Sequence, residues 1–407
     1  MSMLIEPKIR GFICTTAHPT GCAANVHQQI DYIKQHVKVD GPKKVLVIGA
    51  STGYGLASRI AAAFGANAAT IGVFYEKSAA GKRTASAGWY NTAAFETAAH
   101  DAELYAKSIN GDAFSREIKQ QTLELIQQDW HGGVDLVIYS VAAPRRTDAK
   151  TGTIYNSTLK PIGKPYTNHT VNVMTGEVFD ITLEPGTPAE IQETEKVMGG
   201  EDWFDWLDCL QQAGVLAPGV QTLAYSYIGP ELTFPIYRDG TIGAAKQHLY
   251  QTVTAIDALL QPLKGKALIS VNKALVTQAS SAIPVVPLYI SILYKIMKNK
   301  KNHEGCIEQL ARLFSDKLYG SAGIQTDEQG FIRLDDWEMQ ADVQAEVSKI
   351  WDTVSTENLS SLTDIEGYRH EFQKLFGFDI AGVNYGLEVD PEVQIPSISE
   401  LALDETQ

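Results

Sequence analysis

Short apolar runs alternate with amphipathic segments along most of this chain of 407 residues. The run Lys44–Ile48 is almost entirely apolar and rich in β-branched residues, which is typical of a strand buried on both faces of a parallel sheet. Ser115–Asp129 instead carries apolar residues at helical spacing, and Ser115 can cap that helix. Further strands are predicted at Thr70–Tyr75, Tyr105–Ile109, Val134–Ser140, Thr222–Tyr227 and Lys266–Val271, and further helices at Leu56–Phe64, Glu201–Ala213, from Thr241 onward and at Val286–Met297. This alternation predicts a doubly wound parallel α/β sheet.

A glycine-rich turn follows the first of these strands. Its sequence is Gly49-Ala50-Ser51-Thr52-Gly53-Tyr54-Gly55, and the predicted helix Leu56–Phe64 comes next. Glycines permit a tight turn and the close approach of a pyrophosphate, whose charge is favoured at a helix N-terminus. The spacing differs from the Gly-x-Gly-x-x-Gly fingerprint and resembles the version in short-chain dehydrogenases and reductases. The turn therefore predicts a dinucleotide site.

Glu76 ends the second strand, about 20 residues past the glycine turn, where a carboxylate can hydrogen-bond the adenosine ribose hydroxyls. A carboxylate at that position repels a 2'-phosphate, so it favours NADH over NADPH. The alternative is a glutamate at a strand end that simply faces water. Asp112 follows the third strand and is placed to meet the adenine amino group, and the small residues after Val134–Ser140 suit a backbone that lies against a cofactor ribose.

The alternation of strands and helices breaks between Pro144 and about Gly200. Tyr166–Val173 and Glu177–Leu183 alternate polar with apolar residues and are joined by Met174-Thr175-Gly176. This pattern predicts a hairpin insertion, which we expect over the mouth of the cofactor cleft.

Tyr237 and Lys246 form the candidate catalytic pair. The usual short-chain reductases place such a pair one turn apart on a shared helical face. Here Lys246 follows Tyr237 by nine positions, and nine steps of about 100° would put the two on opposite faces of a continuous helix. We therefore expect Tyr237 in the loop before a helix that starts near Thr241, from which the two side chains can converge.

The last third of the chain is less informative. The apolar helix Val286–Met297 either walls an acyl pocket or fills the core, since periodicity does not separate the two. Lys295, Lys298, Lys300 and Lys301 at its end form either a solvated face or a site for carrier phosphate groups. No catalytic constellation is expected in the final hundred or so residues, which carry Trp337 and Trp351.

Composition limits the partners and the compartment. A formal net charge of -14 and a pI near 5.1 argue against nucleic acid or an anionic membrane as the main partner. Four cysteines in a chain of this length form no disulfide framework, and no long apolar segment occurs, so we expect a cytoplasmic protein. Cys14, His18, Cys22 and His27 are too evenly spread for a structural zinc site, so no metal is expected.

The glycine turn, Glu76, and Tyr237 with Lys246 together resemble the FabV/TER family of trans-2-enoyl-ACP and trans-2-enoyl-CoA reductases, over nearly the whole chain. The resemblance implies a monomeric Rossmann-type fold like that of the short-chain reductases, NADH as cofactor, and an enoyl thioester on acyl-carrier protein or coenzyme A as substrate. The physiological role stays open between fatty-acid biosynthesis, which the habit of the family favours, and the disposal of reducing equivalents. Carried over by position, Tyr237 is the proton donor and Tyr227 a substrate contact. Cofactor contacts fall on Gly49, Ala50, Ser51, Thr52, Gly53, Tyr54, Glu76, Lys77, Asp112, Ala113, Val141, Ala142, Lys246, Leu275, Val276 and Thr277.

The length of the chain admits either two average domains or one domain with insertions. We expect one enlarged NAD-binding reductase domain over residues 1–400, with the hairpin-like insertion at 145–200 and a substrate-pocket loop and helix at 279–301. Residues 401–407 are expected to form an acidic tail.

The predicted chemistry is reduction of the double bond conjugated to the thioester. Tyr237, with Lys246 nearby, is expected to hydrogen-bond the thioester oxygen and supply the proton, and the ammonium is expected to lower the pKa of the phenol. Two alternatives stay open: a ketoreductase of the same superfamily, and a non-catalytic NADH sensor in which Tyr237 is only a packed loop residue.

Overall fold

Seven parallel strands form the centre of the computed structural model, which describes residues 2–11 and 13–398. Their order in the sheet is β13-β12-β11-β6-β3-β4-β5, so the chain reverses its direction of travel across the sheet between β3 and β6. Such a reversal opens a crevice at the carboxyl ends of the strands, where ligands bind in doubly wound folds. The strands are β3 (Lys44–Ile48), β4 (Ala69–Phe74), β5 (Ala106–Asn110), β6 (Val134–Tyr139), β11 (Leu216–Ser226), β12 (Lys266–Val271) and β13 (Phe331–Arg333).

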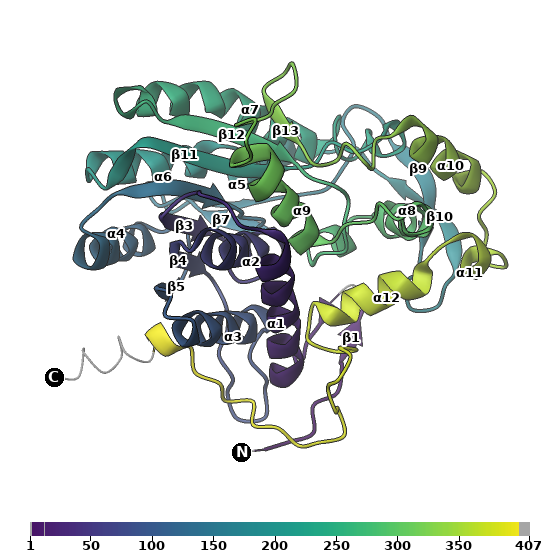
Figure 1. Ribbon diagram of the computed structural model, residues 1–407. Helices are drawn as coiled ribbons and strands as arrows, with labels where there is room; N and C mark the ends of the chain where they lie inside the picture. The colour runs from purple at the N-terminus through teal and green to yellow at the C-terminus, as the bar shows by residue number, and fades with distance from the viewer. Residues whose placement is uncertain (1, 12, 399–407) are drawn as a thin grey trace.

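Helices cover both faces of this sheet (Figure 1). Within β3, Val45 and Val47 face one apolar core while Leu46 and Ile48 face the other, which explains the unbroken apolar run. The first core contains α1 (Pro19–His36), α2 (Gly53–Ile60), α3 (Ala87–Asp101) and α9 (Cys306–Arg312). The second core contains α4 (Arg116–Leu125), α6 (Glu201–Gln212) and α7 (Thr241–Leu260), and α5 (Pro188–Met198) packs on α7. The predicted Rossmann-type doubly wound fold is confirmed.

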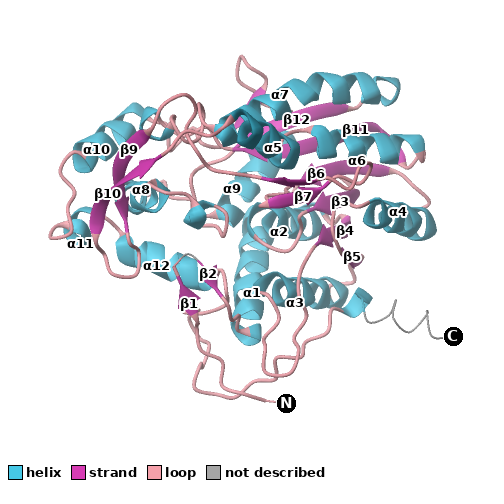
Figure 2. Cartoon of the chain, turned by 180° about the vertical axis from the view of Figure 1, so that it is seen from behind, coloured by secondary structure: helices cyan, strands magenta, loops and turns pink. Residues whose placement is uncertain are grey.

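A third core lies beside the sheet, at the end where its strands finish (Figure 2). The predicted hairpin is present there as β9 (Tyr166–Val171) paired antiparallel with β10 (Val178–Leu183). It contacts α8 (Val286–Lys300), and the Trp351 Nε1 donates a hydrogen bond to Asn168 Oδ1 at 3.0 Å. The other elements of this region are α10 (Ala341–Trp351), α11 (Leu359–Leu362) and α12 (Ile365–Lys374). Two short pairs complete the strands: β1 (Ile9–Arg10) with β2 (Ile13–Cys14), and β7 (Arg145–Thr147) with β8 (Ile154–Asn156).

Helices α1, α3 and α5 are among those that were not predicted. Helix α3 is buried over most of its circumference and is rich in alanine and aromatic residues, so it lacks a polar face. Helix α2 begins at Gly53 rather than at Leu56, which brings the start of the helix into the glycine turn. The expected acidic tail at 401–407 lies outside the described residues.

The C-terminal stretch returns to the N-terminal part of the chain. Val389 pairs with Met3 through two backbone hydrogen bonds of 3.0 Å. Farther on, the Trp89 indole donates to the Val393 carbonyl at 2.7 Å, and the Tyr90 hydroxyl donates to the Pro391 carbonyl at 2.8 Å. The end of the described chain is thus fastened to α3. None of the helices in the described ranges is both long and apolar enough to cross a bilayer.

Candidate active site

The predicted site residues gather at the carboxyl edge of the parallel sheet. Each group follows a different strand, and parallel strands bring their carboxyl ends to one edge. The glycine turn follows β3, Glu76 and Lys77 follow β4, Asp112 and Ala113 follow β5, Val141 and Ala142 follow β6, Tyr227 and Tyr237 follow β11, and Leu275, Val276 and Thr277 follow β12; Lys246 lies in the second turn of α7.

The glycine turn has the geometry that a pyrophosphate requires. Gly49 has a φ of +89°, and a Cβ there would lie 2.1 Å from the Ser140 carbonyl oxygen. A side chain is therefore excluded both by the backbone conformation and by the neighbouring loop. Helix α2 then starts at Gly53 without a capping side chain, so its first backbone N–H groups remain available to an anion.

A hydrogen bond holds the Glu76 side chain beside the glycine turn. Its Oε1 accepts a hydrogen bond from the Ser51 hydroxyl at 2.7 Å, and its backbone is bonded on both sides by Asn110. Burial raises the pKa of this carboxyl, and hydrogen bonds from Ser86 and Ser51 oppose that rise. The carboxylate is thus presented beside the dinucleotide turn rather than free in water, as ribose recognition requires. Lys77 is exposed.

A buried network of hydrogen bonds fixes the loop that contains Asp112 and Ala113. The Ala113 carbonyl accepts from Lys119 Nζ at 3.2 Å and from the Trp206 indole at 3.1 Å. Lys119 in turn forms an ion pair of 2.6 Å with Asp202, which also accepts the Tyr139 hydroxyl at 3.0 Å. We call Lys119, Tyr139, Asp202 and Trp206 the Asp202 network. Because Tyr139 directly precedes Ser140 and Val141, the network joins the loops after β5 and β6.

Tyr237 lies in the loop before α7, as the helix phase predicted. The loop folds back on the helix so closely that a Cβ at Gly243 would lie 2.0 Å from the Arg238 carbonyl oxygen. The Tyr237 ring packs edge-on against Tyr227, with ring centroids 4.6 Å apart at 78°. No residue in the described ranges makes a hydrogen bond with the Tyr237 hydroxyl, which leaves that group free for a ligand.

Lys246 does not pair directly with Tyr237. Its Nζ donates to the Tyr225 carbonyl at 3.3 Å, and burial lowers the pKa of this lysine to about 8. The expectation that the ammonium lowers the pKa of Tyr237 is wrong: burial raises that pKa, and the charge of Glu338 and the Tyr368 hydroxyl raise it further. The phenol is therefore held in its neutral, proton-donating form.

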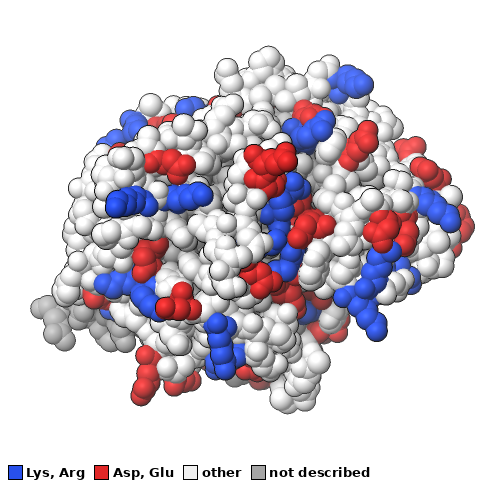
Figure 3. All heavy atoms as spheres, turned by 45° about the horizontal axis from the view of Figure 1, so that its top comes forward, with Lys and Arg blue, Asp and Glu red and all other residues white. Residues whose placement is uncertain are grey.

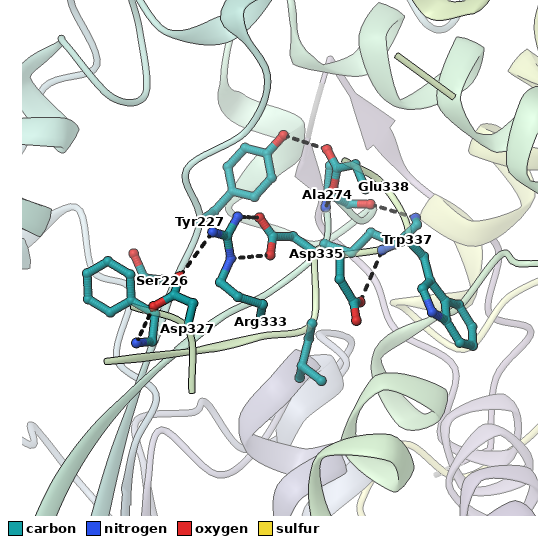
Figure 4. Close-up of polar contacts among 12 residues, drawn as sticks. Ser226, Tyr227, Ala274, Asp327, Arg333, Asp335, Trp337 and Glu338 are labelled. Carbon is teal, nitrogen blue, oxygen red and sulfur yellow. Dashed lines mark hydrogen bonds and ion pairs between the residues drawn. The ribbon is translucent and has the colours of Figure 1, made fainter. Parts of the chain in front are cut away.

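Glu338 is the residue that the sequence analysis missed. It is fully buried, and Figure 4 shows it between Tyr227 and the backbone of Ala274, the residue before Leu275. The final hundred or so residues, in which no catalytic constellation is expected, thus place one carboxylate in contact with Tyr227. The short edge strand β13, Phe331–Arg333, carries the following residues to the same sheet edge, but three residues give almost no signal in the sequence.

Helix α8 packs in the interior of the protein, and its residues Lys298 and Lys300 form ion pairs. Eleven of the fifteen α8 residues are buried, so the helix fills the third core. Lys298 pairs with Asp364 at 2.6 Å, and Lys300 pairs with Asp342 and Glu346 at 2.8 Å each. These ion pairs tie α8 to α10 and α12. On the face shown in Figure 3, Lys and Arg side chains are interspersed with Asp and Glu. Among the described residues no cluster of His, Cys, Asp and Glu is arranged to hold a metal ion.

Comparison with known proteins gives matches over almost the entire chain. Residues 4–81 match the family model for the NAD(P)H binding domain of trans-2-enoyl-CoA reductase, and residues 83–319 match the trans-2-enoyl-CoA reductase catalytic region. Residues 326–389 match a model described as the enoyl reductase FAD binding domain.

Similar relatives and structures agree with these models. An enoyl-[acyl-carrier-protein] reductase [NADH] of Coxiella burnetii (strain RSA 493) is 62% identical over 399 residues, covering 98% of each chain. A protein of the same name from Flavobacterium johnsoniae is 59% identical over 97% of this chain and 100% of its own. The crystal structure of Treponema denticola trans-2-enoyl-CoA reductase with NAD matches with a TM-score of 0.93 and 48% identity, over 97% of this chain and 100% of that chain. The Clostridium acetobutulicum trans-2-enoyl-CoA reductase with NADH also gives a TM-score of 0.93, with 45% identity over 96% and 98% of the two chains.

The segment 326–389 does not fit a flavin dinucleotide. A pyrophosphate needs free N–H groups at a helix N-terminus, and carboxylates there repel it. Helix α10 has Asp342 in its first turn, and α12 is capped by the Asp364 carboxylate with Glu366 beside it. The Trp351 ring, which could have stacked on a flavin, is buried and hydrogen-bonded within the third core. The dinucleotide features lie instead in the glycine turn and at Glu76.

Proposed function

Since the chain belongs to the trans-2-enoyl-CoA reductase family, we propose that Tyr237 is the proton donor in its NADH-dependent reduction of an enoyl thioester. The enzyme acts on the carbon–carbon double bond conjugated to the thioester and uses NADH. The observation that carries the assignment of Tyr237 is its free hydroxyl at the sheet edge, in a loop whose backbone is fixed against α7.

Tyr237 acts on the oxygen of the thioester. NADH, when bound, supplies the hydride that reduces the β-carbon. Negative charge then develops on the thioester oxygen, where the Tyr237 hydroxyl donates a hydrogen bond and afterwards gives up the proton that completes the reduction. The raised pKa of Tyr237 keeps the phenol protonated before the reaction. Tyr227, packed edge-on against Tyr237, is proposed to contact the substrate beside the same oxygen.

The cofactor is proposed to lie along the sheet edge from Glu76 to Lys246. The α2 N-terminus would receive the pyrophosphate and Glu76 the adenosine ribose, as the Ser51 hydrogen bond and the Gly49 conformation support. The loops after β5, β6 and β12 would line the rest. Lys246 is proposed to bind the cofactor and not to act on Tyr237.

The carrier and the physiological setting are also proposals. We propose acyl-carrier protein as the natural carrier and fatty-acid biosynthesis as the pathway, because relatives at 62% identity carry that name whereas the proteins named coenzyme A reductases match at 45% and 48%. All four cysteines are free, which fits the reducing cytoplasm proposed as its location. We further propose a monomer built as a single enlarged domain, a prediction that light scattering of the purified protein would check.

The test follows NADH absorbance with matched substrates. Crotonyl-acyl-carrier protein and crotonyl-CoA should both be reduced, with the higher kcat/KM for the carrier protein, whereas acetoacetyl-CoA should not be reduced. Reduction of acetoacetyl-CoA alone would instead indicate a ketoreductase. Binding of NADH without turnover of any of the three substrates would indicate a sensor.

A further inference from the structure

Glu338, a carboxylate from the C-terminal segment, lies next to Tyr227 of the candidate site (Figure 4). Glu338 Oε1 accepts hydrogen bonds from the Tyr227 hydroxyl at 3.0 Å and from the Tyr289 hydroxyl at 2.6 Å. Its Oε2 accepts from the Ala274 backbone N–H at 2.7 Å. Three donors on one buried carboxylate hold that group in a single orientation.

The charge of Glu338 is compensated differently from that of nearby acidic residues. Asp335 forms an ion pair of 2.6 Å with Arg333, and Glu304 forms one of 2.8 Å with Arg312. In the part of the chain that the structure describes, no lysine or arginine lies within ion-pair distance of Glu338. The hydrogen-bond partners of this carboxylate are two phenols and one backbone N–H. Burial raises its pKa, and the buried Lys273 opposes that rise by charge attraction without forming an ion pair with it.

The groups that Glu338 holds belong to the proposed reaction. Tyr227 packs against the proton donor Tyr237, and Ala274 begins the loop that carries the cofactor residues Leu275–Thr277. We propose that Glu338 is a positioning residue of the reduction, which fixes the Tyr227 hydroxyl and the start of this loop relative to Tyr237. This inference rests on the proposed role of Tyr237 as the proton donor.

A second effect of Glu338 is electrostatic. Burial raises the pKa of Tyr237, and the Glu338 charge adds to the rise because it disfavours a neighbouring phenolate. Loss of the negative charge should therefore let Tyr237 ionise at lower pH. The other titratable groups around this carboxylate and phenol are Tyr227, Tyr289, Tyr368, Lys273 and Asp335.

The test begins with two variants of Glu338. Glu338→Gln keeps the shape but replaces one acceptor oxygen with a donor, and the loss of a hydrogen bond to a charged group corresponds to a decrease in kcat of about 10-fold to 100-fold. The KM for NADH should change by less than about 3-fold, since the pyrophosphate and ribose contacts stay. The basic limb of the pH profile should move to lower pH. Glu338→Asp keeps the charge but shortens the side chain, so kcat should fall while the pH profile stays in place.

Glu304→Gln is the matched control. Glu304 is 5% exposed and sits in the neighbouring ion-pair network, but it touches neither tyrosine. Its variant should lower the melting temperature and leave kcat and the pH profile unchanged. In a double-mutant cycle, Tyr227→Phe and Glu338→Gln should be non-additive in kcat, because part of the effect of the carboxylate acts through the Tyr227 hydroxyl.

The outcomes separate this inference from the proposed function. A Glu338→Gln enzyme with the kcat and pH profile of the parent overturns the inference, as does a Glu304→Gln enzyme with an equal loss of kcat. If Glu338→Gln does not fold, the test uses Glu338→Asp in a double-mutant cycle with Tyr227→Phe. Additive effects of these two substitutions on kcat overturn the inference. Full activity of Tyr237→Phe would instead refute the proton-donor assignment on which the inference rests.

Discussion

Two buried carboxylates support opposite halves of the sheet edge, and their partners differ in kind. Asp202 pairs with a lysine at 2.6 Å, and that lysine holds the backbone carbonyls of Ala113 and Phe114. Glu338 accepts two phenol hydroxyls and one backbone N–H. Asp202, paired with Lys119, fixes main chain beside the proposed cofactor site, whereas Glu338 fixes two tyrosine side chains, of which Tyr227 is proposed to contact the substrate. Disruption of the first should mainly affect folding and NADH affinity, and disruption of the second should mainly affect turnover.

Lys119→Met should have the largest effect, and it should be on stability. The substitution leaves Asp202 buried without its cation, which typically costs about 3–5 kcal/mol in the free energy of unfolding. Denaturant titration measures this loss, and the folded fraction should bind NADH more weakly while keeping a near-normal kcat. Lys107→Met is the control, because the Lys107 pair with Asp129 is partly exposed and should contribute only about 1 kcal/mol or less. A fall in kcat larger than the fall in NADH affinity would contradict the division between the two halves.

Tyr237→Phe should lower turnover by roughly 100-fold or more, the usual scale for loss of a positioned acid or oxyanion donor. NADH binding, measured by fluorescence titration, should stay nearly unchanged because no cofactor contact is assigned to this hydroxyl. Tyr319→Phe provides the comparison, because the Tyr319 hydroxyl donates to Gln221 in the middle of β11 and has no role in the proposed site. Equal activity of the two variants would remove Tyr237 from the mechanism.

Glu76→Ala should weaken NADH binding by about 10-fold, the scale of a charge-assisted hydrogen bond to the ribose. The kcat/KM for NADPH should rise relative to that for NADH, because the carboxylate that repels the 2'-phosphate of NADPH is removed. The ratio of the two kcat/KM values measures the change. Asp40→Asn, an exposed acidic position just before the amino end of β3, should leave that ratio unchanged. An unaltered ratio in Glu76→Ala would show that another group selects the cofactor.

The smallest effect concerns pH. Burial lowers the pKa of Lys246 to about 8, so the ammonium is present below that pH and is lost above it. Because a cation favours an anionic cofactor, NADH affinity should fall by a few-fold as pH rises through about 8. Titrations in Lys246→Met should lack this dependence. Burial also lowers the pKa of Lys273 to about 8, so Lys273→Met must retain the dependence if Lys246 is its origin.

The arrangement of the proposed nucleotide half was predictable because its determinants are local in sequence. The run Lys44–Ile48, the glycines after it and Glu76 lie within one strand-turn-helix-strand unit, so spacing alone placed them together. The loop position of Tyr237 also followed from a local argument, the phase of the helix that starts at Thr241. These predictions needed only the regular geometry of helices and parallel strands.

The catalytic half was only partly predictable, because its determinants are distant in sequence. Glu338 reaches Tyr227 only through β13, a strand of three residues that leaves almost no periodic signal. The wrong expectation for the pKa of Tyr237 has the same origin. That expectation rested on Lys246, which is near Tyr237 in sequence. Burial and the charge of Glu338, which is distant in sequence, raise the pKa instead. Long-range packing therefore determines the protonation state that the motif leaves open.

The position of β13 at the edge of the sheet has a consequence for synthesis of the chain on the ribosome. The glycine turn, Glu76 and both tyrosines leave the ribosome well before the strand Phe331–Arg333 and the Glu338 that follows it. The returning stretch that pairs Val389 with Met3 is translated later still. A nascent or prematurely ended chain can thus complete the dinucleotide-binding strands before the tyrosine pair has its supporting carboxylate.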